Sequence, residues 1–194
     1  SSDGKYKFNA DGNTTRQPWF GCACCPSNLC RFIPSVPGYL YGVKDNNIYV
    51  NLFAGNTSTI KVNGKDVVLE ETTEYPWNGD IKIAVKKSGV KNANLLVRIP
   101  GWVRNQVVPS DLYKYSDAEK PAYTVTINGK AVEADLDANK GYLPVKNIKK
   151  GDVIRIHFDM PIRTVVANDK VADDKGKVAV ERGPLVYCAE AVDN

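Results

Sequence analysis

The sequence predicts an all-β protein, a jelly-roll-like β-sandwich with an irregular N-terminal arm and one short helix. Three observations support this. From Tyr39 onward, short apolar or alternating runs are separated by turn residues, the pattern of strands with one buried face. Asn63-Gly64 and Asn128-Gly129 stand between β-prone flanks and suit the type I′ turns of hairpins. Helical periodicity is nearly absent from the same region.

Each strand is placed by a run of apolar or β-branched residues between turn signals. Pro100-Gly101 and Gly183-Pro184 mark strand ends, because proline has no N–H to donate to a central ladder. The polar stretch 105–121 is expected to be a long loop. The predicted strands span residues 39–43, 48–53, 59–62, 67–71, 81–85, 95–99, 123–127, 153–158 and 177–181.

Charge and hydropathy exclude two classes of partner. The 26 basic and 22 acidic side chains are interleaved, so the net charge of +4 forms no basic patch for nucleic acid. No apolar run approaches the roughly 20 residues that cross a bilayer, and no signal-peptide core indicates a localisation. The only methionine is Met160, so we expect the sequence to be part of a longer chain.

Four of the five cysteines are clustered at Cys22, Cys24, Cys25 and Cys30. A disulfide between adjacent cysteines is strained. A helix predicted to begin at Pro26 and to be limited by Pro34 would place Cys24 and Cys25 just before its N-terminus, where the helix dipole favours a thiolate. The residues alone leave three interpretations open: buried structural thiols, a metal or catalytic site, and a disulfide.

Other residues give weaker signals. His157, the only histidine, lies in a predicted strand and is expected to be an ordinary sheet residue. Glu70 and Glu71 should point to opposite faces of their strand, which makes them a poor acid/base pair. The run Asp135-x-Asp137-x-Asn139 is compared with a calcium loop, but its glycine and twelfth residue do not fit, and a polar turn is preferred.

One segment identifies a family. Residues 19–28, Trp-Phe-Gly-Cys-Ala-Cys-Cys-Pro-Ser-Asn, resemble the signature of glycoside hydrolase family 127, formerly a domain of unknown function numbered 1680, whose studied members are β-L-arabinofuranosidases. The resemblance covers nearly the whole chain. Further matching segments are Tyr-Val-Asn-Leu-Phe at 49–53, Glu-Tyr-Pro-Trp at 74–77, Arg-Ile-Pro-Gly-Trp at 98–102 and Arg-Gly-Pro-Leu-Val-Tyr-Cys at 182–188.

The resemblance implies a domain order in which an (α/α)6 catalytic barrel precedes β-sandwich domains. Residues 1–38 would then be the end of the barrel, carrying the cysteine motif, and residues 39–164 the β-sandwich. Residues 165–194 would complete the sandwich or lead into a second β domain. The parent would be a bacterial retaining glycosidase that acts on plant-type glycans with arabinofuranoside-like substrates, and the missing barrel would be this chain's partner.

The resemblance also implies site roles. Cys24 would be the nucleophile, and Cys24 and Cys25 would bind zinc together with a Glu and a Cys from an upstream Glu-x-Cys segment. The acid/base glutamate would lie in the missing barrel, so the isolated chain is expected to be inactive and to lack part of the zinc site. Cys22 is not expected to be a ligand. Cys30 departs from the family pattern and is expected to be a buried helix residue.

Two alternatives belong to other functional classes. In the first, the chain is a non-catalytic carbohydrate-binding or scaffolding module whose Trp77 and Trp102 stack on sugars, although burial at sandwich edges is the preferred interpretation of both residues. In the second, the chain is a small zinc module that uses Cys22, Cys24, Cys25 and Cys30, which is sterically tight.

Overall fold

The computed structural model describes residues 24–189 and divides the chain into two compact units at Gly38 and Tyr39. The described chain begins with helix α1 (Cys24–Phe32), the 3-10 turn η1 (Ile33–Ser35) and the four-residue helix α2 (Pro37–Leu40). No residue of α1 is buried among the described residues. None of the described helices has the length and apolar character needed to cross a membrane.

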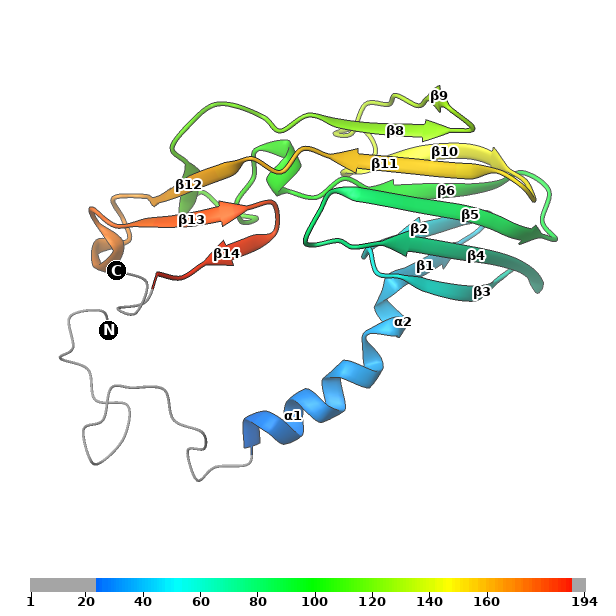
Figure 1. The fold of residues 1–194 in the computed structure, drawn as a ribbon, viewed down its shortest axis with the longest axis horizontal. Coiled ribbons are helices and arrows are strands. Elements are labelled where there is room, and N and C mark those ends of the chain that lie inside the picture. Colours follow the sequence, from blue (N-terminus) through cyan, green and yellow to red (C-terminus); the bar gives the residue numbers. More distant parts are fainter. Residues whose placement is uncertain (1–23, 190–194) are drawn as a thin grey trace. The chain divides into compact units, whose positions relative to one another are not determined.

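Three sheets follow the helices (Figure 1). Sheet A has the strand order β1-β2-β6-β10, and its β2 and β6 are parallel. Sheet B has the order β3-β4-β5-β11-β8-β9 and is antiparallel throughout. Sheet C has the order β14-β13-β12-β7.

The strand bounds are as follows. Sheet A consists of β1 (Tyr41–Lys44), β2 (Asn47–Val50), β6 (Ala93–Arg98) and β10 (Tyr142–Ile148). Sheet B consists of β3 (Asn56–Val62), β4 (Lys65–Thr73), β5 (Asp80–Ser88), β8 (Tyr123–Ile127), β9 (Lys130–Ala131) and β11 (Val153–Phe158). Sheet C consists of β7 (Tyr113–Tyr115), β12 (Ile162–Ala167), β13 (Val178–Arg182) and β14 (Leu185–Tyr187). Two 3-10 turns, η2 (Trp102–Arg104) and η3 (Ala172–Asp174), lie between strands.

One hydrophobic cluster joins the buried faces of sheets A and B. Burial alternates along the strands, as in β5, where Ile81, Ile83 and Val85 are buried and the intervening residues are more exposed. Each such side chain contributes about 1.5–3 kcal/mol when fully buried. The all-β sandwich predicted from the alternating pattern is therefore confirmed.

Both Asn-Gly predictions are confirmed. Asn63 and Gly64 have φ of 48° and 75° between β3 and β4, and Asn128 and Gly129 have φ of 50° and 80° between β8 and β9. Positive φ at both central positions is the requirement of a type I′ turn, and Asn-Gly meets it at low steric cost.

Some strand predictions were wrong. The stretch predicted as a loop at 105–121 contains β7, and β10, β12 and β14 were not predicted. Pro144 lies inside β10, which is an edge strand, where a missing N–H costs no ladder bond. The Gly183-Pro184 break is the short connection between β13 and β14. Sequence patterns missed β10 and β12 because Pro144 interrupts the apolar run of β10 and the charged Arg163 occupies a buried position of β12.

Candidate active-site motif and polar cleft

Cys24 and Cys25 occupy the first two described positions of α1, and both are exposed. The prediction that the helix begins at Pro26 is corrected, since the helix already includes both cysteines. Pro26 fits the first turn because the N–H groups there have no acceptor within the helix. The Ser27 hydroxyl donates to the Cys24 carbonyl at 3.0 Å. Cys22 lies outside the described residues.

The distance between the two thiols permits a test of the expected zinc site. The Sγ atoms of Cys24 and Cys25 are 3.7 Å apart, far too long for a disulfide bond. Two thiolates bound about 2.3 Å from one tetrahedral zinc ion would lie about 3.8 Å apart. The pair therefore fits two corners of a zinc tetrahedron. Residues 24–189 contain no group of three or more metal-ligating side chains, so they supply at most this half of a ligand set.

The remaining described cysteines do not join the pair. Cys30 was expected to be buried in the helix, but it is exposed because α1 buries none of its residues among those described. Cys188 follows β14 and is also exposed. Cys24 and Cys25 are likewise exposed within residues 24–189, so the interpretation as buried structural thiols finds no support in the described part of the chain.

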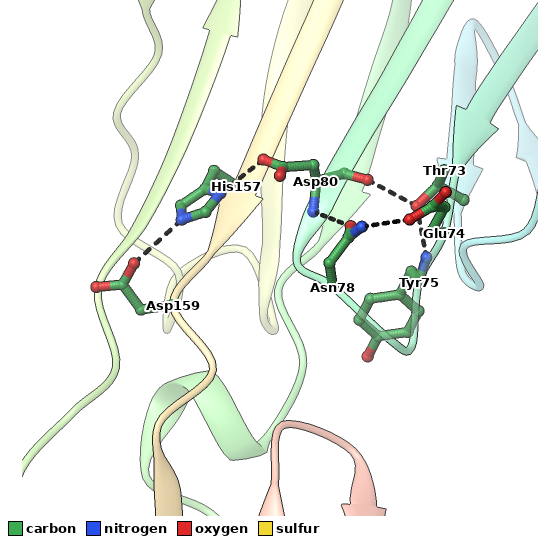
Figure 2. Close-up of polar contacts among 7 residues, drawn as sticks. All are labelled: Thr73, Glu74, Tyr75, Asn78, Asp80, His157 and Asp159. Atoms are coloured by element: carbon green, nitrogen blue, oxygen red, sulfur yellow. Dashed lines mark hydrogen bonds and ion pairs between the residues drawn. The ribbon is translucent and has the colours of Figure 1, made fainter.

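His157 is not the isolated histidine that the sequence indicated. Its Nδ1 lies 2.7 Å from Asp80 Oδ1 and its Nε2 lies 3.1 Å from Asp159 Oδ1 (Figure 2). The hydrogen bond to Asp80 has the largest effect and raises the pKa of His157 above its usual value. Asp159 directly follows β11, two residues after His157, a spacing that places both side chains on the same side of extended chain. Asp80 becomes a partner only through the register of β5 with β11, which no local pattern reveals.

The turn between β4 and β5 is held by its own side chains, as Figure 2 shows. The Thr73 hydroxyl donates to the Asp80 carbonyl at 2.7 Å and accepts from the Tyr75 N–H at 2.9 Å. The Asn78 amide donates to Glu74 Oε2 at 2.9 Å, and its oxygen accepts from the Asp80 N–H at 3.0 Å. The turn is therefore a fixed structure that positions Asn78 and Asp80.

A polar cleft of about 590 Å³ opens beside this turn. It lies between the end of β11 in sheet B and, in sheet C, the start of β12 and the end of β13. Asn78 and Asp80 come from the turn and β5, His157 and Asp159 from the end of β11, and Arg182 from β13. Sequence reasoning missed this cleft because its lining comes from separate segments between Asn78 and Arg182, which meet only in the folded chain.

The two tryptophans considered for sugar stacking differ in exposure. Trp102 is 9% exposed, contacts the Phe158 ring at 5.7 Å and donates from Nε1 to the Tyr75 hydroxyl at 3.3 Å. Burial of Trp102 is therefore confirmed. Trp77 is 70% exposed, so its assignment to the core is wrong. The turn places Trp77 next to Asn78, outside the hydrophobic cluster.

Glu70 and Glu71 do point to opposite faces. Glu70 forms a salt bridge with Lys86 at 2.8 Å, whereas Glu71 is 3% exposed. Glu71 accepts from the Tyr41 hydroxyl at 3.1 Å and from the Ala54 N–H at 3.0 Å. Burial raises the pKa of Glu71 to about 7.

The segment 135–139, compared above with a calcium loop, forms hydrogen bonds within itself. Asp135 Oδ1 accepts from the backbone N–H groups of Asp137 at 2.9 Å and Ala138 at 3.1 Å, and the Asn139 amide donates to the Asp135 carbonyl at 2.6 Å. The segment is thus a polar turn with an Asx-type side-chain bond.

The fold and the motif define a class: a β-sandwich region preceded by a helix that carries a cysteine pair. The chain matches the family model described as "Beta-L-arabinofuranosidase, GH127 middle domain" over residues 47–160. It also matches "Glycoside hydrolase family 127 C-terminal domain" over residues 162–194. The chain therefore belongs to glycoside hydrolase family 127 and corresponds to the C-terminal portion of its members.

Three individual relatives are described as arabinofuranosidases. A non-reducing end β-L-arabinofuranosidase from Bifidobacterium longum subsp. longum is 36% identical over 186 residues, 92% of this chain and 25% of the relative. A solved family 127 β-arabinofuranosidase is 55% identical with a TM-score of 0.86, covering 94% of this chain and 28% of its own. A solved family 127 β-L-arabinofuranosidase from Geobacillus stearothermophilus T6 is 34% identical with a TM-score of 0.75, covering 94% and 26%. The chain thus spans about a quarter of these relatives.

Proposed function

We propose that this chain is the C-terminal part of a retaining glycosidase that removes β-L-arabinofuranosyl groups, and that Cys24 is its nucleophile. The relatives' activity supports the substrate class. The observation that carries the role of Cys24 is the pair of exposed thiols 3.7 Å apart at the start of α1, which suits two ligands of one zinc ion.

The ligand set divides between this chain and the rest of the enzyme. Cys24 and Cys25 would hold zinc together with groups from outside the 194 residues. Bound zinc supplies positive charge that keeps a neighbouring thiol in its nucleophilic thiolate form. The arrangement takes the place of the carboxylate nucleophile that most retaining glycosidases use.

The reaction then proceeds in two displacements. The Cys24 Sγ electron pair forms a bond to the anomeric carbon of the sugar while the bond from that carbon to the leaving oxygen breaks. The leaving oxygen takes a proton from an acid outside this chain. Water, giving its proton to the same group, attacks the anomeric carbon, and the carbon–sulfur bond breaks to restore the thiolate. Two inversions give net retention.

The sandwich has a structural role in this proposal. The helices α1 and α2 lead directly into β1, whose Tyr41 is bound by the buried Glu71 of β4. This hydrogen bond fixes the strand that follows the cysteine helix. The buried core between sheets A and B supplies the stability of that anchor.

The test uses the full-length protein that contains this chain, with an aryl β-L-arabinofuranoside as substrate. Cys24→Ser is expected to lower kcat by a factor of about 10³ or more, as is usual for loss of a nucleophile. Cys30→Ser is the matched control and should retain activity, because Cys30 is not part of the pair. The 194-residue chain alone should show no turnover. Full activity in Cys24→Ser, or turnover by the isolated chain, would refute the proposal.

The alternative of a binding module based on Trp77 and Trp102 as one surface is not favoured. Trp102 is buried against Phe158 and cannot stack on a ligand. Trp77 is exposed, and the residue that follows it, Asn78, lines the polar cleft.

A further inference from the structure

The β4–β5 turn and the end of β11 build a rigid wall for the polar cleft. Asn78 and Asp80, on either side of Gly79, are fixed by the hydrogen bonds of the turn. The Phe158 N–H donates to the Gly79 carbonyl at 3.1 Å, which ties the turn to β11. Because these groups are already fixed in the free protein, ligand binding carries no entropic cost for ordering this wall.

The charges around the cleft are balanced. Four carboxylates face the permanent cations Lys120, Arg163 and Arg182 and the titratable His157. Arg163 is paired with Asp117 at 2.6 Å, and His157 lies between Asp80 and Asp159. A phosphate or polyanion would be repelled by the carboxylates, and a simple cation would meet the arginines. Because both signs of charge line the cleft, a neutral polar ligand fits it best.

The same side chains offer both donors and acceptors. Asp80 and Asp159 each use Oδ1 for His157, which leaves Oδ2 to accept from a ligand. Arg182 uses Nη1 to donate to the Trp77 carbonyl at 3.0 Å and has further N–H groups to donate. Adjacent donors and acceptors of this kind match the vicinal hydroxyls of a sugar, each of which both donates and accepts.

The backbone of Trp77 lies next to these groups, although its side chain is not part of the cleft lining. Its indole is 70% exposed, its neighbour Asn78 lines the cleft, and its carbonyl is bound by Arg182. The flat indole ring packs well against the C–H faces of a sugar ring, so a bound oligosaccharide that extends past Asn78 would contact Trp77.

We propose that the cleft lined by Asn78, Asp80, His157, Asp159 and Arg182, with Trp77 at its side, binds a neutral oligosaccharide. The bound segment would be held by hydrogen bonds to its hydroxyls and by contact with the Trp77 indole. The inference goes beyond the proposed function, because it requires neither Cys24 nor zinc and describes binding without bond cleavage.

The experiment titrates the 194-residue chain with a neutral arabino-oligosaccharide of three to five units, followed by calorimetry and by amide chemical shifts. Saturable binding is expected, with shifts at Asn78, Asp80 and Asp159. Trp77→Ala and Arg182→Ala should each weaken binding by about ten-fold or more. Tyr187→Ala is the matched control, an exposed aromatic on β14 outside the cleft lining, and should bind as the wild type does.

Comparison probes separate the outcomes. Inorganic phosphate and an oligogalacturonate of equal length should not bind, and preferential binding of either would overturn the neutral-ligand inference. No saturable binding of the neutral oligosaccharide, or equal affinity in the wild type and Trp77→Ala, would overturn the site. Thermal unfolding of each variant shows that it is folded, and the wild-type shift map locates the site even where a variant is not. In the full-length protein, loss of hydrolysis in Cys24→Ser with oligosaccharide binding retained would separate this site from the proposed catalytic role.

Discussion

Glu71 shows how one residue links the two sheets of the sandwich. Its carboxylate belongs to β4 of sheet B and accepts from Tyr41 of β1 in sheet A and from Ala54 in the connection before β3. A carboxylate removed from water favours its neutral form, and burial is the main cause of the raised pKa of about 7. The residue therefore makes the anchor of β1 sensitive to pH.

The first prediction concerns Glu71→Gln. In the unfolded chain the carboxyl ionises near 4.5 and in the folded chain near 7, so its protonation favours folding at low pH and this contribution is lost as pH rises from 4.5 to 7. The loss amounts to up to about 3 kcal/mol. Glutamine has no such loss, and its side-chain oxygen can still accept from the Ala54 N–H while its NH2 group donates to the Tyr41 hydroxyl oxygen.

Urea unfolding at pH 5 and pH 8 measures the effect. From pH 5 to pH 8, the free energy of unfolding of Glu71→Gln should rise relative to that of the wild type. His157 also has a raised pKa, and its stabilising effect also fades as pH rises, but it is present in both proteins and cancels in the comparison. A difference that is the same at both pH values would contradict the prediction.

At the scale of elements, the β4–β5 turn depends on close contact with β11. A Cβ at Gly79 would lie 1.9 Å from the Phe158 carbonyl oxygen, which is a backbone atom and cannot rotate away. Phe158 itself is 1% exposed and packs on Phe53, Tyr75 and Trp102. Glycine is therefore required by close approach, and the turn and the strand cannot separate without disturbing the core.

The second prediction follows from this contact. Gly79→Ala should lower the free energy of unfolding by about 3 kcal/mol, because the backbones of the turn and β11 must move apart. Gly129→Ala is the matched control: its Cβ would meet open space, and only its positive φ of 80° costs about 1 kcal/mol. Urea unfolding at one pH measures both variants. An equal decrease in the free energy of unfolding would show that the close contact with Phe158 adds no cost and would contradict the prediction.

At the scale of the whole molecule, the described chain is a β-sandwich region preceded by a helix that carries the adjacent cysteines Cys24 and Cys25. Family models divide it between residues 160 and 162, where β11 of sheet B gives way to β12 of sheet C. The sheets need no metal for their core, which is apolar and continuous. Zinc binding and folding should therefore be independent in this chain.

The third prediction tests that independence. Zinc added to the 194-residue chain should be removed by dialysis against a chelator, because two thiol ligands leave half of the tetrahedron to weak ligands. The melting temperature of the sandwich should be the same before and after chelation. One equivalent of zinc that resists the chelator would instead support a self-contained site built from Cys22, Cys24, Cys25 and Cys30.

Much of the fold could be predicted because its signals are local. Alternation along β5 and β11 and the Asn-Gly pairs each act within a few residues, where side-chain direction and φ are set by the backbone. Strands β7, β10 and β12 carry weaker patterns, since Pro144 interrupts β10 and Arg163 occupies a buried position of β12. Those strands form because distant partners complete their ladders.

The features of the candidate sites also divide into those that local sequence predicts and those that depend on tertiary structure. The sequence by itself determined the cysteine pair, the all-β class and the family resemblance, because these depend on residues adjacent along the chain. Only the tertiary structure decided the partners of His157, the burial of Glu71, the exposure of Trp77 and the existence of the cleft. Each of those depends on strand register and on which segments meet in space, which is set by the packing of the whole core.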